Sequence, residues 1–340
     1  MKTELYTKAQ IDEAAKQIQL GELVSFPTET VYGLGADATN DTAVQKVYQA
    51  KGRPSDNPLI VHVADVATVE KYAEPLSDAA KKLIKQFWPG PLTLIFNLKP
   101  DALSTHVTGG LTTAAFRMPN NQATLDLIKT AGIPLVGPSA NTSGKPSPTL
   151  AEHVYHDLNG KIAGILDDGA TQLGVESTVL DMSTEVPTVL RPGAVSIEQL
   201  EAIIGNVVSN KHHVGLKEVP KAPGMKYKHY APNAQVYIVD QPSEFPEALK
   251  WAGQQPFLVG LMVTDELAAN LTLPANVELY SLGTDVNSAS HLLFAALRHF
   301  DENPQVKAIL TEAFKPEGIG AAYMNRLDKS AGQRHFGDDR

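Results

Sequence analysis

Cysteine is absent from the 340 residues of this chain. A chain without cysteine has no disulfide framework, no thiolate zinc site and no cysteine nucleophile. Long apolar runs are also missing, since none approaches the ~18 residues that a membrane span requires. The N-terminal residues 1–5 lead into an amphipathic pattern rather than the apolar core of a signal peptide. These absences predict a cytoplasmic protein that is neither exported nor anchored in a membrane.

An excess of positive charge is missing as well, because the formal net charge is -9 at pH 7. Broad, sequence-independent binding to nucleic acid depends on a basic surface that neutralises phosphates. The net charge argues against such binding and leaves only a local basic patch open. With 43% apolar and 20% charged residues, the composition is that of an ordinary globular protein, and its length predicts two domains.

Strand and helix patterns divide the chain into three parts. Residues 1–209 alternate short apolar strands with amphipathic helices. Residues 210–233 contain five lysines, three histidines and five glycines or prolines with little periodicity, which indicates a linker. Residues 234–340 again alternate strands and helices, which predicts a smaller Rossmann-like domain with a parallel sheet. No G-x-G-x-x-G motif occurs there, so no dinucleotide is expected.

Local signals place several elements of the first part. Ser77 is expected to begin a buried helix, and Asp41 to cap the helix that leads to Lys51. Residues 59–63 are expected to form a buried strand that contains His62. Small and hydroxylated residues fill 28–35, so a loop is predicted there in which the backbone approaches a ligand closely.

The segment 51–59, Lys-Gly-Arg-Pro-Ser-Asp-Asn-Pro-Leu, has the composition of a binding loop. Lys51 offers a point charge and Arg53 a planar fork of donors, and both suit phosphate or carboxylate. The two prolines restrict the backbone around them. The pattern predicts a stiff loop outside the core that displays both cations and the Asn57 amide.

Further polar side chains follow the ends of predicted strands in residues 1–209. Ligand sites of α/β proteins form at such strand ends. The cations are Lys51, Arg53, Arg117 and Arg191, and the neutral donors are Thr30, Ser139, Asn141, Ser147 and Ser177. This inventory predicts an anionic ligand and fits a nucleotide, although no Walker A sequence is present.

Each of these residues also has a purely structural interpretation. His62 in an apolar strand fits a hydrogen-bonded core histidine, and Arg117 or Arg191 fits a surface salt bridge. Isolated serines mostly serve as turn or cap residues, and Glu29 or Glu176 fits a brace of its own loop. A metal site at the linker histidines is disfavoured, because no cysteine or carboxylate spacing supports it.

Seven segments, in order along the chain, resemble the YrdC-domain family. They are residues 26–34, 51–59, 88–91, 116–117, 138–144, 175–179 and 190–193, with Phe26-Pro27-Thr28-Glu29-Thr30 and Pro138-Ser139-Ala140-Asn141-Thr142-Ser143-Gly144 among them. Residues 223–232 and the additional C-terminal domain resemble the long, two-domain members of the family. The resemblance implies a twisted, open mixed sheet with helices, joined by an ordered linker to the Rossmann-like domain.

The resemblance also implies an activity. L-threonine, bicarbonate and ATP would give threonylcarbamoyl-AMP and pyrophosphate, and the product would serve in making threonylcarbamoyladenosine beside the anticodon of tRNA. Positioning and charge neutralisation would supply most of the catalysis, without a covalent enzyme intermediate. Magnesium would bridge phosphate oxygens, and no protein ligand is assigned to it.

Residue roles follow from the same resemblance. L-threonine would contact Thr30, His62, Arg117 and Ser177, with Arg117 at its carboxylate. ATP would contact Arg53, Asn57, Thr113, Ser139, Ser147, Arg191 and Tyr230. Lys51 and Arg53 would act as catalytic cations, and Asn141 would support the loop of Ser139. An aromatic residue among the linker lysines suggests the hypothesis that residues 211–232 form a lid over the active site.

Two alternatives compete with this function. An RNA-binding module of the same type without the activity would need a basic cleft, which the net charge disfavours. A carbamoyl-transfer maturation factor would carry zinc fingers, which a chain without cysteine does not form. Besides ATP, L-threonine and bicarbonate, the expected partners are tRNA and the later tRNA-modification enzymes, in transient contact. A monomer is expected.

Overall fold

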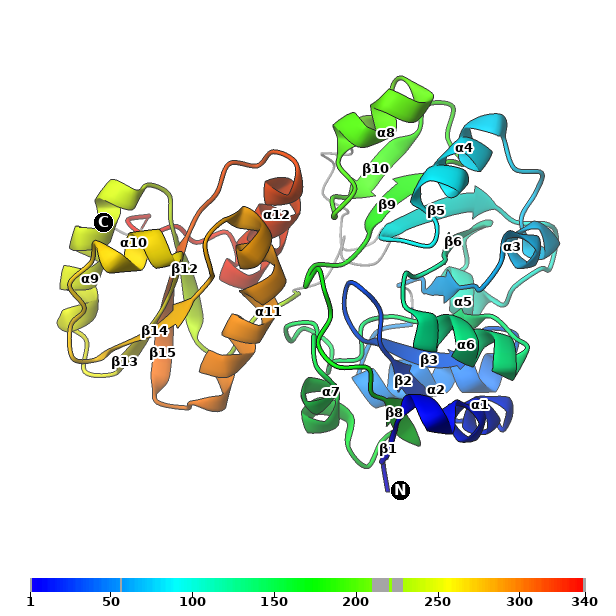
Figure 1. The fold of residues 1–340 in the computed structure, drawn as a ribbon, viewed down its shortest axis with the longest axis horizontal. Helices are drawn as coiled ribbons and strands as arrows, with labels where there is room; N and C mark the ends of the chain where they lie inside the picture. Colours follow the sequence, from blue (N-terminus) through cyan, green and yellow to red (C-terminus); the bar gives the residue numbers. More distant parts are fainter. Residues whose placement is uncertain (1, 56, 210–219, 222–228, 339–340) are drawn as a thin grey trace. The chain divides into compact units, whose positions relative to one another are not determined.

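The computed structural model describes residues 2–55, 57–209, 220–221 and 229–338, so most of the predicted linker and lid lies outside the described residues. The chain divides into two compact units (Figure 1). The first comprises Met1–Ser143, Ser147–Gln172 and Glu176–Tyr227, and the second comprises Gly144–Pro146, Leu173–Val175 and Lys228–Arg340. The chain therefore leaves the first unit twice before residue 228. The boundaries expected at residues 209 and 234 stay a prediction.

An eleven-stranded mixed sheet forms the centre of the first unit. In spatial order its strands are β1 (Glu4–Tyr6), β8 (Gly164–Leu166), β2 (Val24–Phe26), β3 (Gly33–Asp37), β7 (Leu135–Val136), β4 (Ile60–His62), β6 (Thr113–Arg117), β5 (Leu92–Asn97), β9 (Thr178–Asp181), β10 (Thr188–Arg191) and β11 (Val208–Ser209). Parallel and antiparallel neighbours both occur, as in the pairs β4–β6 and β5–β6. The predicted mixed sheet is confirmed.

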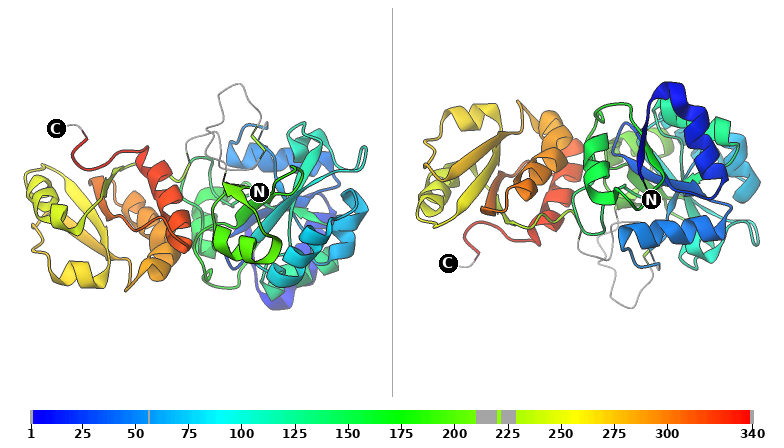
Figure 2. Two further views of the ribbon diagram at one scale, coloured as in Figure 1. Left: turned by 90° about the horizontal axis from the view of Figure 1, so that it is seen from above. Right: turned by 90° about the horizontal axis from the view of Figure 1, so that it is seen from below.

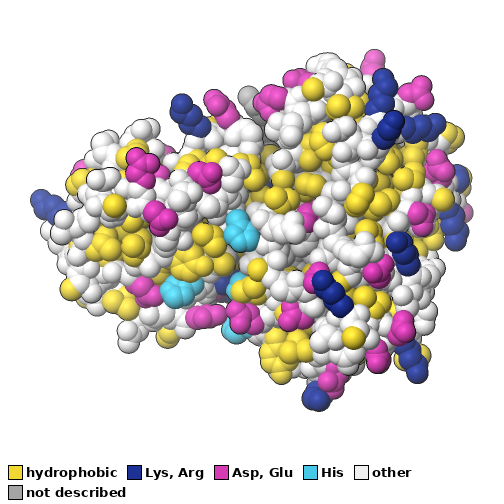
Figure 3. Space-filling model, in the orientation of Figure 1, with side chains coloured by type: hydrophobic (Ala, Val, Ile, Leu, Met, Phe, Trp, Pro, Cys, Tyr) yellow, Lys and Arg dark blue, Asp and Glu magenta, His cyan; other side chains and the backbone are white. Residues whose placement is uncertain are grey.

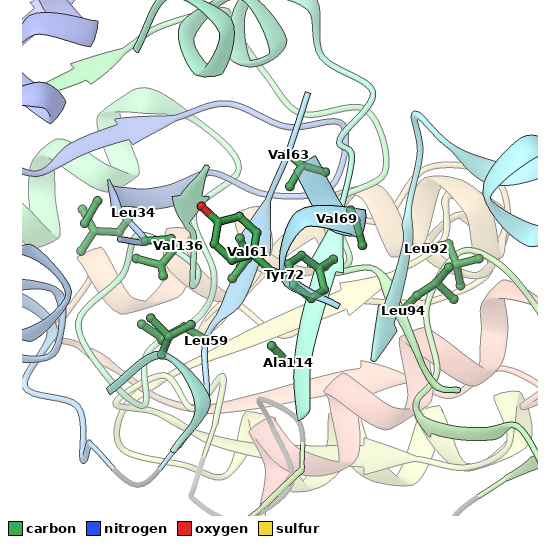
Figure 4. Packing of buried hydrophobic residues seen from close by; sticks show 14 of the residues in the cluster. Leu34, Leu59, Val61, Val63, Val69, Tyr72, Leu92, Leu94, Ala114 and Val136 are labelled. Atoms are coloured by element: carbon green, nitrogen blue, oxygen red, sulfur yellow. The ribbon is translucent and has the colours of Figure 1, made fainter. Parts of the chain in front are cut away.

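Helices cover both faces of this sheet (Figure 2). They are α1 (Ile11–Gln19), preceded by the 3-10 helix η1 (Lys8–Gln10), α2 (Asp41–Lys51), α3 (Val66–Tyr72), α4 (Asp78–Phe87), α5 (Thr105–Thr108), α6 (Gln122–Ala131), α7 (Ala151–Leu158) and α8 (Ile197–Ile204). Successive side chains of a strand point to opposite faces, and Leu135 and Val136 of β7 accordingly belong to two different apolar clusters. The larger cluster surrounds β4, where Leu59, Val61 and Val63 pack with Val69 and Tyr72 of α3 (Figure 4).

Helix α2 begins and ends with local signals. The side chain of Asn40, not Asp41, accepts the capping hydrogen bond, from the backbone N–H of Ala43 at 3.2 Å. The expected cap at Asp41 is therefore wrong by one residue, because Asp41 is already the first helical residue. Gly52 ends the helix in the left-handed conformation with φ 62°, so Lys51 is the last residue of the helix.

Strand β3 includes the last three residues, 33–35, of the segment 28–35 that the sequence suggested as a loop. Gly33 and Gly35 pair with Phe26 and Val24 of β2. A Cβ atom on Gly33 would lie 2.8 Å from the ring of Phe26, and one on Gly35 would lie 2.6 Å from the carbonyl oxygen of Val24. The two glycines therefore admit the buried Phe26 ring between paired strands.

A four-stranded parallel sheet forms the centre of the second unit, in the order β12 (Gln235–Val239), β15 (Val306–Glu312), β13 (Leu258–Val263) and β14 (Val277–Ser281). Its helices are η2 (Pro242–Glu244), α9 (Phe245–Gly253), α10 (Asp265–Ala269), α11 (Val286–Glu302) and α12 (Ile319–Ala331). This alternation confirms the predicted Rossmann-like domain. Within the described parts of both units, no helix combines the length and apolar character that membrane crossing requires.

Candidate active site

Four polar side chains lie in a row across neighbouring strands of the large sheet. His62 ends β4 and pairs in register with Arg117, which ends β6. On β5, the Oγ1 atom of Thr93 lies 2.8 Å from the Oγ atom of Ser177, which directly precedes β9. All four side chains are buried. The sheet thus brings together three residues that the resemblance assigns to L-threonine, together with Thr93, which it does not assign.

Arg117 is the main cation of this row. Its Nη1 donates to the Oγ1 of Thr30 at 2.9 Å, and its Nε donates to the carbonyl oxygen of Gly90 at 3.2 Å. Its Nη2 lies 2.7 Å from the Oε2 of Glu29. The surface salt bridge considered for Arg117 is wrong, because both partners of this ion pair are buried. Thr30, the fourth residue assigned to L-threonine, belongs to the same cluster.

A tight turn between β2 and β3 positions Glu29 and Thr30. The Oγ1 of Thr28 accepts hydrogen bonds from the backbone N–H groups of Thr30 and Val31, both at 3.1 Å. Such a hydroxyl-to-backbone turn replaces the bonds that a strand would make. Its rigidity fixes two buried polar side chains beside Arg117. Pro27 and the hydroxylated residues after it are the local signals of this turn.

His62 is neutral in this environment. Burial lowers the pKa of His62 to about 3, and the nearby positive charge of Arg117 is the second cause of this decrease. Its ring meets that of Phe26 edge-on at 5.2 Å. Among the described residues, none forms a hydrogen bond with its buried Nδ1. His62 therefore offers a neutral, polar ring nitrogen inside an otherwise charged cluster.

Arg191 fixes the position of Ser177. Its Nε and Nη2 donate to the carbonyl oxygen of Ser177 at 3.1 and 3.0 Å, and Nη2 also lies 3.1 Å from the Ser177 Oγ. This planar fork binds one backbone position by two parallel bonds. The side chain is buried, so the surface interpretation of Arg191 is also wrong.

Lys51 lies inside the protein, not on a displayed loop. Lys51 is the last residue of α2 and is 2% exposed. Its Nζ donates to the carbonyl oxygen of Asn141 at 2.7 Å. The carbonyl oxygen of Ser139 accepts a second hydrogen bond from the same Nζ. The expected loop outside the core is wrong for Lys51 because α2 continues through this residue. Its ammonium group holds the loop after β7.

Arg53 and Asn57 come together beyond the end of α2. The Nη2 of Arg53 donates to the carbonyl oxygens of Asn57 and Pro58 at 3.3 and 3.2 Å. The hydroxyl of Tyr48 also donates to the Asn57 carbonyl, at 3.1 Å. The Asn57 side chain is buried, and within the described ranges no donor binds its Oδ1. The expected display of the Asn57 amide outside the core is therefore wrong, because this residue is only 1% exposed.

The remaining residues assigned to ATP lie at several places. The Oγ of Ser147 donates to the Oε1 of Glu176 at 2.6 Å, and Ser139 forms a bridge with Gly33. Asn141, which was assigned only a supporting role for the loop of Ser139, donates through its Nδ2 to the carbonyl of Thr142 at 2.8 Å. Thr113 starts β6 while Arg117 ends it, which separates their backbones by roughly 13 Å at ~3.3 Å per residue. Thr113 is therefore not part of the cluster around Arg117.

Tyr230 belongs to the second unit. It is 5% exposed, and its ring lies 5.1 Å from that of Phe294 on α11. His229 lies beside it, with ring centroids 5.5 Å apart. The assigned contact of Tyr230 with ATP stays a prediction, and the lid hypothesis rests mainly on residues outside the described ranges.

The fold defines an α/β protein with a buried cluster of polar and charged side chains at the ends of strands β4 and β6. A family model described as "Telomere recombination", for Sua5, YciO and YrdC proteins, matches residues 16–193. A second, described as "Threonylcarbamoyl-AMP synthase, C-terminal domain", matches residues 195–332. The chain belongs to the Sua5/YciO/YrdC family and has the long, two-domain architecture.

Relatives match over nearly the whole chain. The threonylcarbamoyl-AMP synthase of Bacillus subtilis is 49% identical over 326 residues, which cover 96% of this chain and 94% of the relative. That of Pyrococcus abyssi is 43% identical, covering 94% of each chain. The crystal structure of P. abyssi Sua5 complexed with L-threonine superposes with a TM-score of 0.91 at 40% identity, covering 99% of both chains.

Proposed function

We propose that this chain is a nucleotidyltransferase that makes L-threonylcarbamoyl-AMP and pyrophosphate from L-threonine, bicarbonate or CO2, and ATP. The product would serve the threonylcarbamoyladenosine modification of tRNA next to the anticodon. The observation that carries the proposal is the buried cluster of Arg117, Thr30, His62 and Ser177, in a chain 40% identical to a Sua5 protein solved with L-threonine. The curated relatives that match nearly the whole chain are named for the product of this reaction.

The chemistry needs two bond-forming steps. The threonine amine first attacks the carbon of CO2 and loses protons to give a carbamate. A carbamate oxygen then attacks the α-phosphorus of ATP, and the bond from that phosphorus to the bridging oxygen of pyrophosphate breaks. Neither step needs a covalent bond to the protein. The protein's task is to align the carbamate with the phosphate and to compensate their negative charges.

The proposed residue roles fit this task. Arg117 would bind the threonine carboxylate, and Thr30, His62 and Ser177 would surround the rest of the amino acid. ATP would be bound through the set assigned above: Arg53, Asn57, Thr113, Ser139, Ser147, Arg191 and Tyr230. Lys51 would act by holding the loop of Ser139 and Asn141, to which its Nζ is bonded, and by its charge beside the phosphates.

Magnesium would enter as the complex with ATP. Mg²⁺ keeps several water ligands and binds substrate phosphates more often than a full protein cage. Across the part of the chain that the structure describes, no group of three or more His, Cys, Asp or Glu side chains is placed to hold a metal ion. We assign no protein ligand to the metal, and we propose that the phosphates of ATP and water are its main ligands.

Direct contact with tRNA would be local and transient. On the face shown in Figure 3, the Lys and Arg side chains of both units are interspersed with Asp and Glu, and the net charge is -9. Such a surface does not favour broad phosphate binding. We propose a cytoplasmic monomer that passes its product to later enzymes of tRNA modification; cell fractionation and sedimentation test both points.

The central experiment follows pyrophosphate release by the purified protein with ATP, Mg²⁺, bicarbonate and single amino acids. We expect release that requires L-threonine and bicarbonate and is much slower with L-serine or L-valine. Release without any amino acid would refute the assigned reaction. If the protein instead bound tRNA tightly without releasing pyrophosphate, the RNA-binding alternative would replace the enzyme.

A further inference from the structure

The carboxylate of Glu29 is buried without the hydrogen bonds that a buried carboxylate normally accepts. Glu29 is 4% exposed, and its Oε2 lies 2.7 Å from the Nη2 of Arg117. Yet no described residue donates a hydrogen bond to either of its carboxylate oxygens. Buried polar atoms are almost always hydrogen-bonded, and a buried charge that is not is costly. The site thus contains acceptor capacity that the described protein groups leave unused.

The partner of Glu29 is incomplete in the same way. The Nε and Nη1 atoms of Arg117 donate to Gly90 and Thr30, whereas Nη2 donates a well-aligned hydrogen bond to no described residue. A buried cationic donor and a buried anionic acceptor therefore lie side by side. An α-amino acid carries the complementary pair, since its carboxylate and its ammonium group are attached to one carbon atom.

Resting on the proposed function, we propose that Glu29 binds the α-ammonium group of L-threonine while Arg117 binds its carboxylate. The three N–H donors of the ammonium group would satisfy the carboxylate oxygens, and the threonine carboxylate would accept from Arg117 Nη2. Glu29 then selects α-amino acids against hydroxy acids at the binding step. A structural role, in which Glu29 only orients Arg117, would give no such selection.

A double-mutant cycle between protein and ligand separates these two roles. The probes are L-threonine and the matching 2,3-dihydroxy acid, in which a hydroxyl replaces the ammonium group. Calorimetry gives the Kd of each probe for the wild type and for Glu29→Gln, which keeps the side-chain shape. Removing the Glu29 charge also strengthens the attraction of Arg117 for a carboxylate, but this effect is the same for both probes. It therefore cancels in the ratio of the two Kd values, which reports only the contact with the ammonium group.

We expect the wild type to prefer L-threonine over the dihydroxy acid by at least about tenfold, because a hydrogen bond to a charged group is typically worth that factor or more. In Glu29→Gln the preference should fall below about threefold. An equal preference in the two proteins would overturn the proposal. Glu22→Gln is the matched control, since this glutamate pairs with Lys46 at the surface, and it should keep the wild-type preference.

Two further measurements keep the outcome interpretable. If Glu29→Gln does not fold, as judged by thermal unfolding, Glu29→Asp replaces it; its shorter side chain should still reduce the preference at least about threefold, and an unchanged preference would again overturn the proposal. Pyrophosphate release by the wild type is measured alongside. A threonine-dependent release with no change of preference in the variants would reject only the role of Glu29, whereas no release would reject the reaction.

Discussion

The Nζ atom of Lys51 and the carbonyl oxygen of Asn141 lie 2.7 Å apart, so helix α2 holds the loop that follows β7. The carbonyl of Ser139 shares the same ammonium group. A cation in this position has two effects: it fixes the backbone of the loop after β7, and it places a positive charge next to that loop. Lys51, the first residue of the family motif 51–59, is thus part of the interior of the first unit.

Lys51→Met should lower both activity and stability. Each hydrogen bond from a charged group is worth about 1.5–3 kcal/mol, so we expect kcat/KM for ATP to fall at least about tenfold and the free energy of unfolding in urea to fall by a similar energy. Lys46→Met is the control on the same helix, because Lys46 pairs with Glu22 at the surface and surface pairs contribute little. A normal rate in Lys51→Met would contradict the assigned role.

Ser177→Ala should weaken the binding of L-threonine. The substitution removes a hydroxyl that lies 2.8 Å from Thr93 Oγ1 and 3.1 Å from Arg191 Nη2, while the Arg191 bonds to the Ser177 carbonyl remain. We expect KM for threonine to rise about tenfold, whereas KM for ATP should stay within about threefold of the wild-type value. Thr93→Val is the matched control, because it removes only the neighbouring hydroxyl. Equal effects of both variants on the threonine KM would mean that Ser177 acts only through the Thr93 contact.

His62 should make stability depend on pH. Its pKa of about 3 in the folded protein lies below the ordinary value of about 6.5. Between these two pKa values the unfolded chain binds more protons than the folded protein. The stability that the neutral His62 contributes is therefore fully present above pH 6.5 and is lost as the pH falls towards 3. The loss is at most about 1.4 kcal/mol per pH unit.

The measurement is the free energy of unfolding from pH 4.5 to 7.5 for the wild type and His62→Asn. The free energy of unfolding of the wild type should fall, relative to that of His62→Asn, as the pH is lowered from 7.5 to 4.5. His156→Gln, at an exposed histidine beside Asp157, should follow the wild type. A constant difference between the wild type and His62→Asn would show that residue 62 titrates normally in the folded protein.

Strong local signals were sufficient to predict much of the fold. Ser77 does begin α4, and its side chain accepts a hydrogen bond from the Ala80 N–H as a cap should. Strand β3 was missed because glycine has little strand propensity by itself. That strand forms because β2 and β7 pair with it and because the Phe26 ring needs space. Such tertiary causes leave no local signal.

In the candidate site, too, local motifs predicted some features, and contacts between distant elements determined the others. The identities of Arg117, His62, Thr30 and Ser177 followed from motifs, and the strand register brings their elements together. The burial of Lys51 and the pairing of Glu29 with Arg117 were not predictable, because both depend on elements distant in sequence. Thr93 was missed for another reason: a threonine inside a strand is common and attracts no attention.

The second unit should influence ATP binding through the chain segment Gly144–Pro146, which belongs to it. Within that unit, Arg298 of α11 donates through Nη2 to the carbonyl oxygen of Pro146 at 2.7 Å, and Lys145 pairs with Asp301 at 2.9 Å. Pro146 immediately precedes Ser147, one of the residues assigned to ATP. Arg298→Met should therefore remove the hydrogen bond that holds the Pro146 carbonyl directly before Ser147.

We expect Arg298→Met to raise KM for ATP at least about fivefold, since loss of a buried, charge-assisted hydrogen bond leaves a carbonyl without its partner. KM for threonine should stay within about twofold. His299→Gln, the neighbouring residue on α11, is the matched control, because His299 bonds to Glu278 at the surface. Steady-state kinetics with each substrate varied in turn gives both constants. If Arg298→Met and His299→Gln behave alike, the second unit stabilises the chain without setting the position of Ser147.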